Sequence, residues 1–188
     1  MTETSQLIVT REWAMPSPHT FSIPPISALL DRWLPSDQGT IVDPCSGNST
    51  RAGCRNDLRD GVDACDWLDS LICGGRTFST ALLDPPYSPR QIAEVYKGVG
   101  RQVTTSDTQS AALYKKLKDR LDVLLEPGGI AITFGWNTVG FGKVRGYELL
   151  EILIVCHGGA HNDTLVTVER KIQGRMDFRM ESGNDNAI

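Results

Sequence analysis

Two short apolar runs in this chain end in the same way, with an aspartate followed by proline. The first is "TIVDP" at residues 40–44, and the second is "TFSTALLDPPY" at residues 77–87. Proline cannot donate a ladder hydrogen bond and disfavours helical geometry at the residue before it, so each run is expected to be a strand that stops at its aspartate. Ligands of open α/β sheets bind at the carboxyl ends of strands. We therefore expect Asp43 and Asp84 to mark a functional site.

Between and after these runs, strand-like segments alternate with amphipathic ones. Helices are expected within 21–34, where two prolines precede apolar residues at helical spacing, within 61–72, and at 110–129, where a leucine stripe faces lysines and arginine. Further strands are expected at 54–58, 129–136, 147–155 and 164–171. The last two are joined by too few residues for a crossover helix and should pair antiparallel. This pattern predicts an α/β fold with a mostly parallel sheet, helices on both faces and a terminal antiparallel hairpin.

Composition is that of an ordinary globular protein. The chain has 188 residues, of which 40% are apolar and 22% charged. We expect one domain at residues 1–175 and a polar tail at 176–188. The sequence contains no apolar run long enough to span a bilayer, and its first residues lack the pattern of a secretion signal, so we expect a cytoplasmic protein without a membrane partner.

Cysteine spacing and charge narrow the possible partners. The five cysteines are scattered, with no C-x-x-C pair, which argues against a disulfide framework or a zinc ribbon. His157, His161 and Asp163 lie close together, but two histidines on a hairpin loop more often support the loop, and no metal is expected. The net charge of −4 leaves only local basic segments, at 114–120 and 168–175, for contact with nucleic acid. These segments are equally compatible with a solvated helix face and a strand end.

The segment "DPPY" at residues 84–87 is suited to recognising an amine. The Asp84 carboxylate and the Pro85 carbonyl, held by a rigid Pro-Pro unit, are two acceptors close together, which suits the exocyclic amino group of a planar ring. Tyr87 offers a face on which such a ring can stack. The alternative is a plain Pro-Pro turn after an edge strand.

The combination of "DPCSGNS" at 43–49 with "DPPY" about 40 residues later resembles the amino-methyltransferases that use S-adenosylmethionine. The resemblance is greatest to enzymes that modify the amino group of adenine in DNA, and small stand-alone members from phages and mobile elements are especially similar. It extends from Arg11 to Lys171 and includes "TFSIPP", "EPGG" and "HGGAHNDTLVTVERK". It implies a Rossmann-like class I methyltransferase fold, with a mostly parallel seven-stranded sheet that contains one antiparallel strand.

The resemblance also implies roles for individual residues. A target adenine flipped out of DNA is expected to contact the catalytic motif, which comprises Asp84, Pro85, Pro86 and Tyr87. The residues expected to bind S-adenosylmethionine are Thr20, Phe21, Asp43, Pro44, Cys45, Gly47, Asp57, Asp63, Ala64 and Asp84. Cys45 and Ser49 depart from the family, which usually has an aromatic residue and a second glycine there. Asp60 and Asp66 compete for the roles of Asp57 and Asp63.

DNA is the expected partner, and the residues expected to contact its phosphates are Arg90, Arg101 and Lys115. Only about 20 residues separate "DPPYSPRQ" from the leucine-rich helix, which leaves little room for reading bases and predicts a short or relaxed target sequence. A monomer and a homodimer both remain open. The four tryptophans, Trp13, Trp33, Trp67 and Trp136, are expected to pack in the interior.

Other substrates and one other function class stay open at this point. An amine of RNA, cytosine or a glutamine side chain could take the place of adenine. Cytosine enzymes of the family often have serine, and glutamine enzymes usually asparagine, at the position of Asp84, which favours adenine. A non-catalytic nucleic-acid-binding module that retains the fold is the alternative outside enzymes.

Overall fold

The computed structural model describes residues 6–98, 100, 110–138, 140–159 and 161–172. The strands are β1 (Ile8–Trp13), β2 (Ile41–Asp43), β3 (Cys54–Arg55), β4 (Phe78–Leu83), β5 (Leu125–Gly135), β6 (Tyr147–Cys156) and β7 (Thr164–Lys171). The helices are α1 (Pro24–Trp33), α2 (Ala64–Cys73), α3 (Pro89–Gly98) and α4 (Ser110–Leu124). Short 3₁₀ turns are η1 (Thr20–Ser22), η2 (Gln38–Thr40), η3 (Leu58–Asp60) and η4 (Lys143–Arg145).

These strands form one seven-stranded sheet in the order β1-β6-β7-β5-β4-β2-β3. All neighbouring pairs are parallel except those of β7, which runs antiparallel to both β5 and β6. The expected mostly parallel sheet with a terminal antiparallel hairpin is therefore confirmed. Because β2, β4 and β5 are parallel, their carboxyl ends meet at one edge of the sheet.

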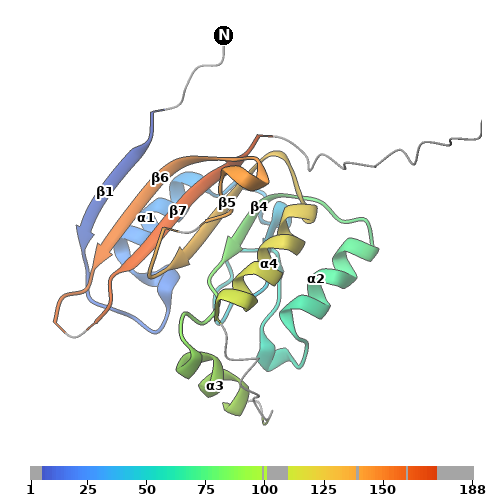
Figure 1. Ribbon diagram of the computed structural model, residues 1–188, viewed down its shortest axis with the longest axis horizontal. Coiled ribbons are helices and arrows are strands. Elements are labelled where there is room, and N and C mark those ends of the chain that lie inside the picture. The colour runs from blue at the N-terminus through green and yellow to red at the C-terminus, as the bar shows by residue number, and fades with distance from the viewer. Residues whose placement is uncertain (1–5, 99, 101–109, 139, 160, 173–188) are drawn as a thin grey trace, which may run out of the picture.

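Helices cover both faces of the sheet, as Figure 1 shows, with α1 behind it and α2 and α4 in front. The α1 side chains Ile26, Leu29 and Leu30 pack in one core against β5, β6 and β7. Leu117, Leu121 and Leu124 of α4 pack in a second core with α2, β4 and the aromatic rings of Phe141 and Tyr147. Burial of these apolar side chains, at about 25 cal/mol per Å², holds the three layers together.

Several local expectations are confirmed. Helix α1 begins at Pro24, because proline at the first helical positions lacks only an N–H that would be unpaired anyway. Strand β4 ends at Leu83, directly before Asp84, and β2 ends at Asp43 itself. In α4 the leucine stripe faces the core as expected, but the helix ends at Leu124 and the following residues, including the Pro-Gly-Gly turn, belong to β5.

Other elements differ from expectation. Residues 8–13, expected as a polar start, form β1, which pairs in parallel with β6 and supplies the seventh strand. Helix α3 was not expected, because few large apolar residues mark it. Trp13, expected in the interior, is 66% exposed on this edge strand. Lys118 was placed on the solvated face of α4 but is buried, and its ammonium donates to the Gly140 carbonyl at 2.7 Å.

The expected domain at 1–175 extends slightly past the described residues, and the expected tail at 176–188 lies outside them. Within the part of the chain that is described, none of the helices is long and apolar enough to cross a membrane.

Candidate functional site

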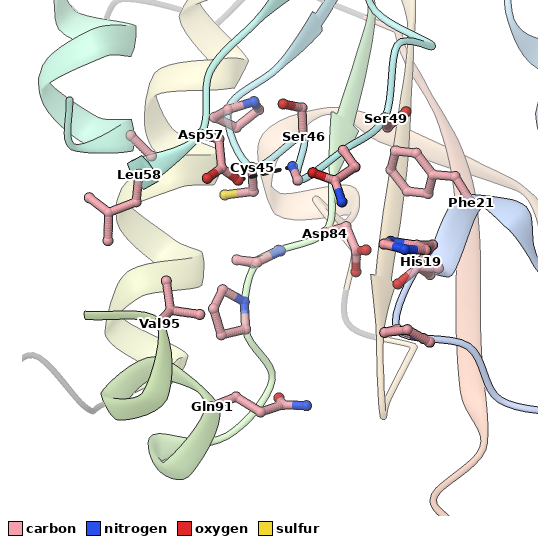
Figure 2. Close-up of a pocket in the computed structure, with 18 of the residues that line it drawn as sticks. His19, Phe21, Cys45, Ser46, Ser49, Asp57, Leu58, Asp84, Gln91 and Val95 are labelled. Atoms are coloured by element: carbon pink, nitrogen blue, oxygen red, sulfur yellow. Dashed lines mark hydrogen bonds between the residues drawn. The ribbon is translucent and has the colours of Figure 1, made fainter. Parts of the chain in front are cut away.

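A cavity of about 890 Å³ opens at the carboxyl ends of β2 and β4. Figure 2 shows its walls: the η1 segment with Phe21 and His19 on one side, Asp57 and Leu58 on the other, and Val95 of α3 below. Of the residues expected to bind the cofactor or the target, those that line the cavity are Thr20, Phe21, Pro44, Cys45, Gly47, Asp57, Asp63, Ala64, Asp84, Pro85, Pro86 and Tyr87. The fold thus brings together residues that are up to 67 positions apart in the sequence, from Thr20 to Tyr87.

Asp84 faces this cavity from the end of β4. Its Oδ1 accepts a hydrogen bond from the Tyr87 hydroxyl three residues later, which fixes the orientation of the carboxylate. Burial raises the pKa of Asp84 to about 6, although hydrogen bonds from Tyr87 and Thr20 lower it. At neutral pH the group is therefore mostly a carboxylate, an acceptor held in a poorly solvated place.

The loop after β2 is held by hydrogen bonds, both to its own strand end and to the loop after β3. The Cys45 N–H donates to Asp43 Oδ1 at 3.0 Å, and the Ser46 N–H donates to the Asn56 carbonyl at 2.9 Å. Gly47 has φ of 56°, a left-handed conformation that favours glycine. These bonds hold the small residues of "CSGNS" as one wall of the cavity.

Asp43 is fully buried and is not among the residues that line the cavity. Its Oδ2 has no hydrogen-bond partner among the described residues. Burial, together with the Asp84 carboxylate, raises the pKa of Asp43 to about 8, although the Cys45 N–H lowers it. Direct contact between Asp43 and a ligand therefore stays a prediction, and in this structure the residue supports the loop from beneath.

Asp57 lies just past β3 and ties two loops together. Its Oδ2 accepts from the Gly47 N–H at 3.0 Å, and its Oδ1 accepts from the Arg59 N–H and guanidinium. Burial tends to raise the pKa of Asp57, but these bonds lower it below its usual value. A carboxylate has about four lone-pair sites, so capacity remains for a ligand hydroxyl.

Asp63 caps α2, accepting from the Cys65 N–H at 2.8 Å, and its other oxygen accepts from the Tyr96 hydroxyl at 3.3 Å. Next to it, Ala64 and Leu58 give this end of the cavity an apolar surface. The competitors Asp60 and Asp66 are exposed and do not line the cavity.

Cys45 contributes a neutral thiol to the cavity wall. Burial and the nearby carboxylates of Asp43 and Asp84 raise its pKa well above its usual range. A protonated thiol in this setting is an apolar contact and not a nucleophile.

Tyr87, whose hydroxyl bonds the Asp84 carboxylate, belongs to an aromatic pair. Tyr87 lines the cavity, and its ring meets that of Trp136 with centroids 5.8 Å apart and planes inclined at 60°. Trp136 was expected in the core, but it is 42% exposed, because β5 ends at Gly135 and the chain leaves the sheet there.

Of the basic residues expected to contact phosphates, Arg90 and Lys115 do not line the cavity. Arg90, in the first turn of α3, has 88% of its side chain exposed and pairs with Glu94. Lys115 is exposed on α4 and pairs with Asp119. Arg101 lies outside the described residues.

The loop before β7 is held by a histidine with structural contacts. The His157 ring bonds the Ala14 carbonyl at 2.9 Å through Nδ1 and the Thr164 hydroxyl at 2.8 Å through Nε2. Among the described residues, no group of three or more histidine, cysteine or acidic side chains is arranged to hold a metal ion.

Some cavity residues were not identified from the sequence. They come from η1 and the residue before it, from the loop after β2, from η3 and from α3, and include His19, Ser46, Asn48, Leu58, Gln91, Val95 and Tyr96. Only the loop residues had a signal, since they adjoin "CSGNS". The residues of α3 had none, because their role depends on how α3 packs beneath the cavity.

Comparison with known proteins shows a likeness of fold. No protein-family model and no curated protein matches the chain. PH0851 is 12% identical, with 77% of this chain and 45% of that protein covered and a TM-score of 0.50. TrmN from Thermus thermophilus is 16% identical, over 80% of this chain and 49% of that one, with a TM-score of 0.48. A methyltransferase homolog from Pyrococcus horikoshii is 14% identical, over 76% of this chain and 65% of that one, with a TM-score of 0.46.

The chain spans about half the length of PH0851 and TrmN. At these identities the likeness is one of fold. The mostly parallel seven-stranded sheet of the expected Rossmann-like fold is confirmed by the strand order, and the likeness to PH0851 is a likeness of this fold.

Proposed function

We propose that this protein transfers a methyl group from S-adenosylmethionine to the exocyclic amino group of adenine in DNA. The observation that carries the proposal is the Asp84 carboxylate, oriented by the Tyr87 hydroxyl and facing a cavity of about 890 Å³ at the carboxyl edge of the sheet. This edge is where α/β folds bind their ligands, and a cavity of this size is in the range of cofactor sites.

The residues present fit the cofactor. Small residues of the loop 44–49 and the ring of Phe21 suit its methionine end, Asp57 has acceptor capacity for ribose hydroxyls, and the apolar wall at Leu58 and Ala64 suits a base. The buried Oδ2 of Asp43, beneath this loop, has no hydrogen-bond partner among the described residues, and a cationic group bound nearby would favour the charged form of this carboxyl. When bound, S-adenosylmethionine supplies an electrophilic methyl group, which ends on the amine nitrogen while the sulfonium becomes a thioether.

Asp84 is the residue that acts on the substrate amine. As a carboxylate it accepts a hydrogen bond from the amine and stabilises the positive charge that develops on the nitrogen. The nitrogen then loses one proton to water. No covalent intermediate between substrate and protein is involved, which agrees with the neutral Cys45 thiol in the cavity wall.

The decisive experiment is incubation with cofactor labelled in its methyl group and with DNA, followed by analysis of nucleosides. We expect label in the methylamino group of adenine. Label only in methylcytosine, in RNA or in protein would contradict the proposal. Parallel reactions on RNA and on single-stranded DNA distinguish the substrates that the sequence leaves open.

Substitution of the key acceptor gives the matched test. We expect Asp84→Ala to slow methyl transfer on the order of a hundredfold or more and to leave cofactor affinity, measured by calorimetry, nearly unchanged. Calorimetry on the parent protein also separates an enzyme from a non-catalytic module, since a module that has lost the cofactor gives no binding heat. Equal rates in variant and parent would mean that the site is elsewhere.

A further inference from the structure

Trp136 is a large aromatic residue left partly in solvent, and its ring contacts that of Tyr87, which lines the cavity. It is one of the largest apolar side chains of the molecule, yet it is 42% exposed, whereas the neighbouring β5 residues Phe134 and Gly135 are buried. Exposed apolar area beside a cavity is typical of a surface that a ligand covers.

The chain around Trp136 fixes its place. Strand β5 is paired with β4 as far as Thr133 and with β7 as far as Gly135, its last residue. The Tyr114 hydroxyl of α4 donates to the Phe134 carbonyl at 2.7 Å. This bond holds the end of strand β5, just before the tryptophan. The indole is therefore presented from a rigid strand end, next to Tyr87.

The rings of Tyr87 and Trp136 are inclined so that the planar ring of a ligand can contact both. Tyr87 and Trp136 are inclined at 60° with centroids 5.8 Å apart. A planar ring that lies against the face of one meets the other at a similar inclination, and both offset-stacked and inclined arrangements of aromatic rings are attractive. Asp84, bonded to the Tyr87 hydroxyl, then lies at the edge of such a ring, where an exocyclic amine would be.

We propose that Trp136 is the second wall of a slot for an extrahelical nucleobase, with Tyr87 as the first wall and Asp84 at the end. This inference rests on the proposed function for the identity of the ring and adds a residue that neither the sequence pattern nor the resemblance assigns. Trp136 binds the base by stacking and takes no part in the transfer itself.

The experiment measures binding separately from chemistry. A short single-stranded oligodeoxyadenylate is titrated into the protein without cofactor, and tryptophan fluorescence is followed, with an abasic strand of equal length as the phosphate control. We expect oligodeoxyadenylate to quench the parent, the abasic strand to quench little, and the quenching to be largely lost in Trp136→Phe. Equal quenching in parent and Trp136→Phe would overturn the inference.

Kinetics of the variants supply the second readout. Base–aromatic stacking contributes enough that Trp136→Ala should raise KM for DNA by roughly tenfold or more, while Trp136→Phe keeps most of the affinity. Cofactor affinity should be unchanged in both. The matched control is Trp13→Ala, an exposed tryptophan on the edge strand β1, which should leave KM as in the parent.

Two outcomes separate this inference from the proposed function. If the parent methylates DNA and Trp136→Ala has the parental KM, the slot is wrong and the proposed function stands. If adenine-dependent quenching by Trp136 is present but no methyl transfer occurs on any nucleic acid, the slot stands and the proposed function is wrong. If Trp136→Ala proves to have a lowered unfolding temperature, Trp136→Phe is used in its place. The quenching test on Trp136→Phe is then sufficient to decide the inference.

Discussion

Asp84 gives the site a pH dependence that can be measured. Burial raises its pKa to about 6, so the acceptor is lost by protonation as pH falls through that value. We expect the rate of methyl transfer to rise from pH 5 to pH 7 and to level off above it, following one proton near pH 6. The residual activity of Asp84→Asn should lack this step. A flat profile in the parent over this range would contradict the role of Asp84 as an ionised acceptor.

Asp43 gives the stability of the fold a pH dependence. Its pKa is raised to about 8 in the folded protein, against about 4 in an unfolded chain, so between these values the folded state holds a proton that the unfolded state has lost. This group therefore stabilises the fold at low pH, and that stability is lost as pH rises toward 8. We expect Asp43→Asn, measured without cofactor by urea unfolding, to be more stable than the parent at pH 8 by on the order of 2 kcal/mol. The difference in the free energy of unfolding between variant and parent should shrink toward pH 5. If variant and parent have the same dependence of stability on pH, the pKa of Asp43 is not raised in the folded protein.

At the scale of elements, a buried carboxylate ties the segment after β5 to the sheet. Glu169 of β7 accepts from the Phe141 and Gly142 N–H groups, the second at 2.8 Å, and Lys118 of α4 donates to the Gly140 carbonyl beside them. An added Cβ at Gly140 would lie 1.9 Å from Glu169 Oε2, so a larger residue there would displace this carboxylate from its position. The segment that begins with Trp136 is thus held by two elements on its return across the sheet.

We expect Glu169→Gln to lower the free energy of unfolding by about 2 kcal/mol, because one of the two N–H groups would face an amide donor in place of an acceptor. Glu12→Gln, on the exposed edge strand β1, is the control and should change stability little. Unfolding of both variants in urea checks this. Parental stability of Glu169→Gln would mean that the two backbone contacts contribute nothing net.

At the scale of the whole molecule, charge decides how nucleic acid is held. The net charge is −4, so attraction to phosphates must come from individual basic side chains. Arg90 is well suited, since its exposed pair with Glu94 is of a kind that contributes little and can exchange for a phosphate. We expect affinity for DNA to fall steeply with salt, and Arg90→Ala to weaken all sequences alike and to reduce the salt slope by about one.

Lys143→Ala is the matched control, because Lys143 is exposed in η4, before the first residue of β6 and so at the opposite edge of the sheet. Methylation mapped on a long duplex should show a target of only a few base pairs. A long and stringent target sequence, or an Arg90→Ala effect limited to some sequences, would indicate that this chain reads bases.

The sequence by itself determined those features whose causes are local. Proline after Asp43 and before Tyr87 stops the strands wherever they lie, the leucine repeat of α4 selects its buried face, and the short link between β6 and β7 permits only an antiparallel pair. These causes were enough for the fold class and for the places of Asp43 and Asp84 at strand ends, whereas the other expected cavity residues came from the resemblance to a family.

Only the tertiary structure decided what depends on partners distant in sequence. Ile8–Trp13 become a strand because β6 offers an edge to them, and Lys118 is buried because the Gly140 carbonyl lies within its reach. Asp43 is the last residue of one strand and Asp84 directly follows another. Yet Asp43 lies beneath the loop and Asp84 faces the cavity, because the Cys45 N–H holds the first and the Tyr87 hydroxyl holds the second. Trp136 is exposed for a similar reason: its strand ends one residue earlier, and no later segment among the described residues buries it. Solvent exposure is a property of the packed whole, which no local pattern encodes.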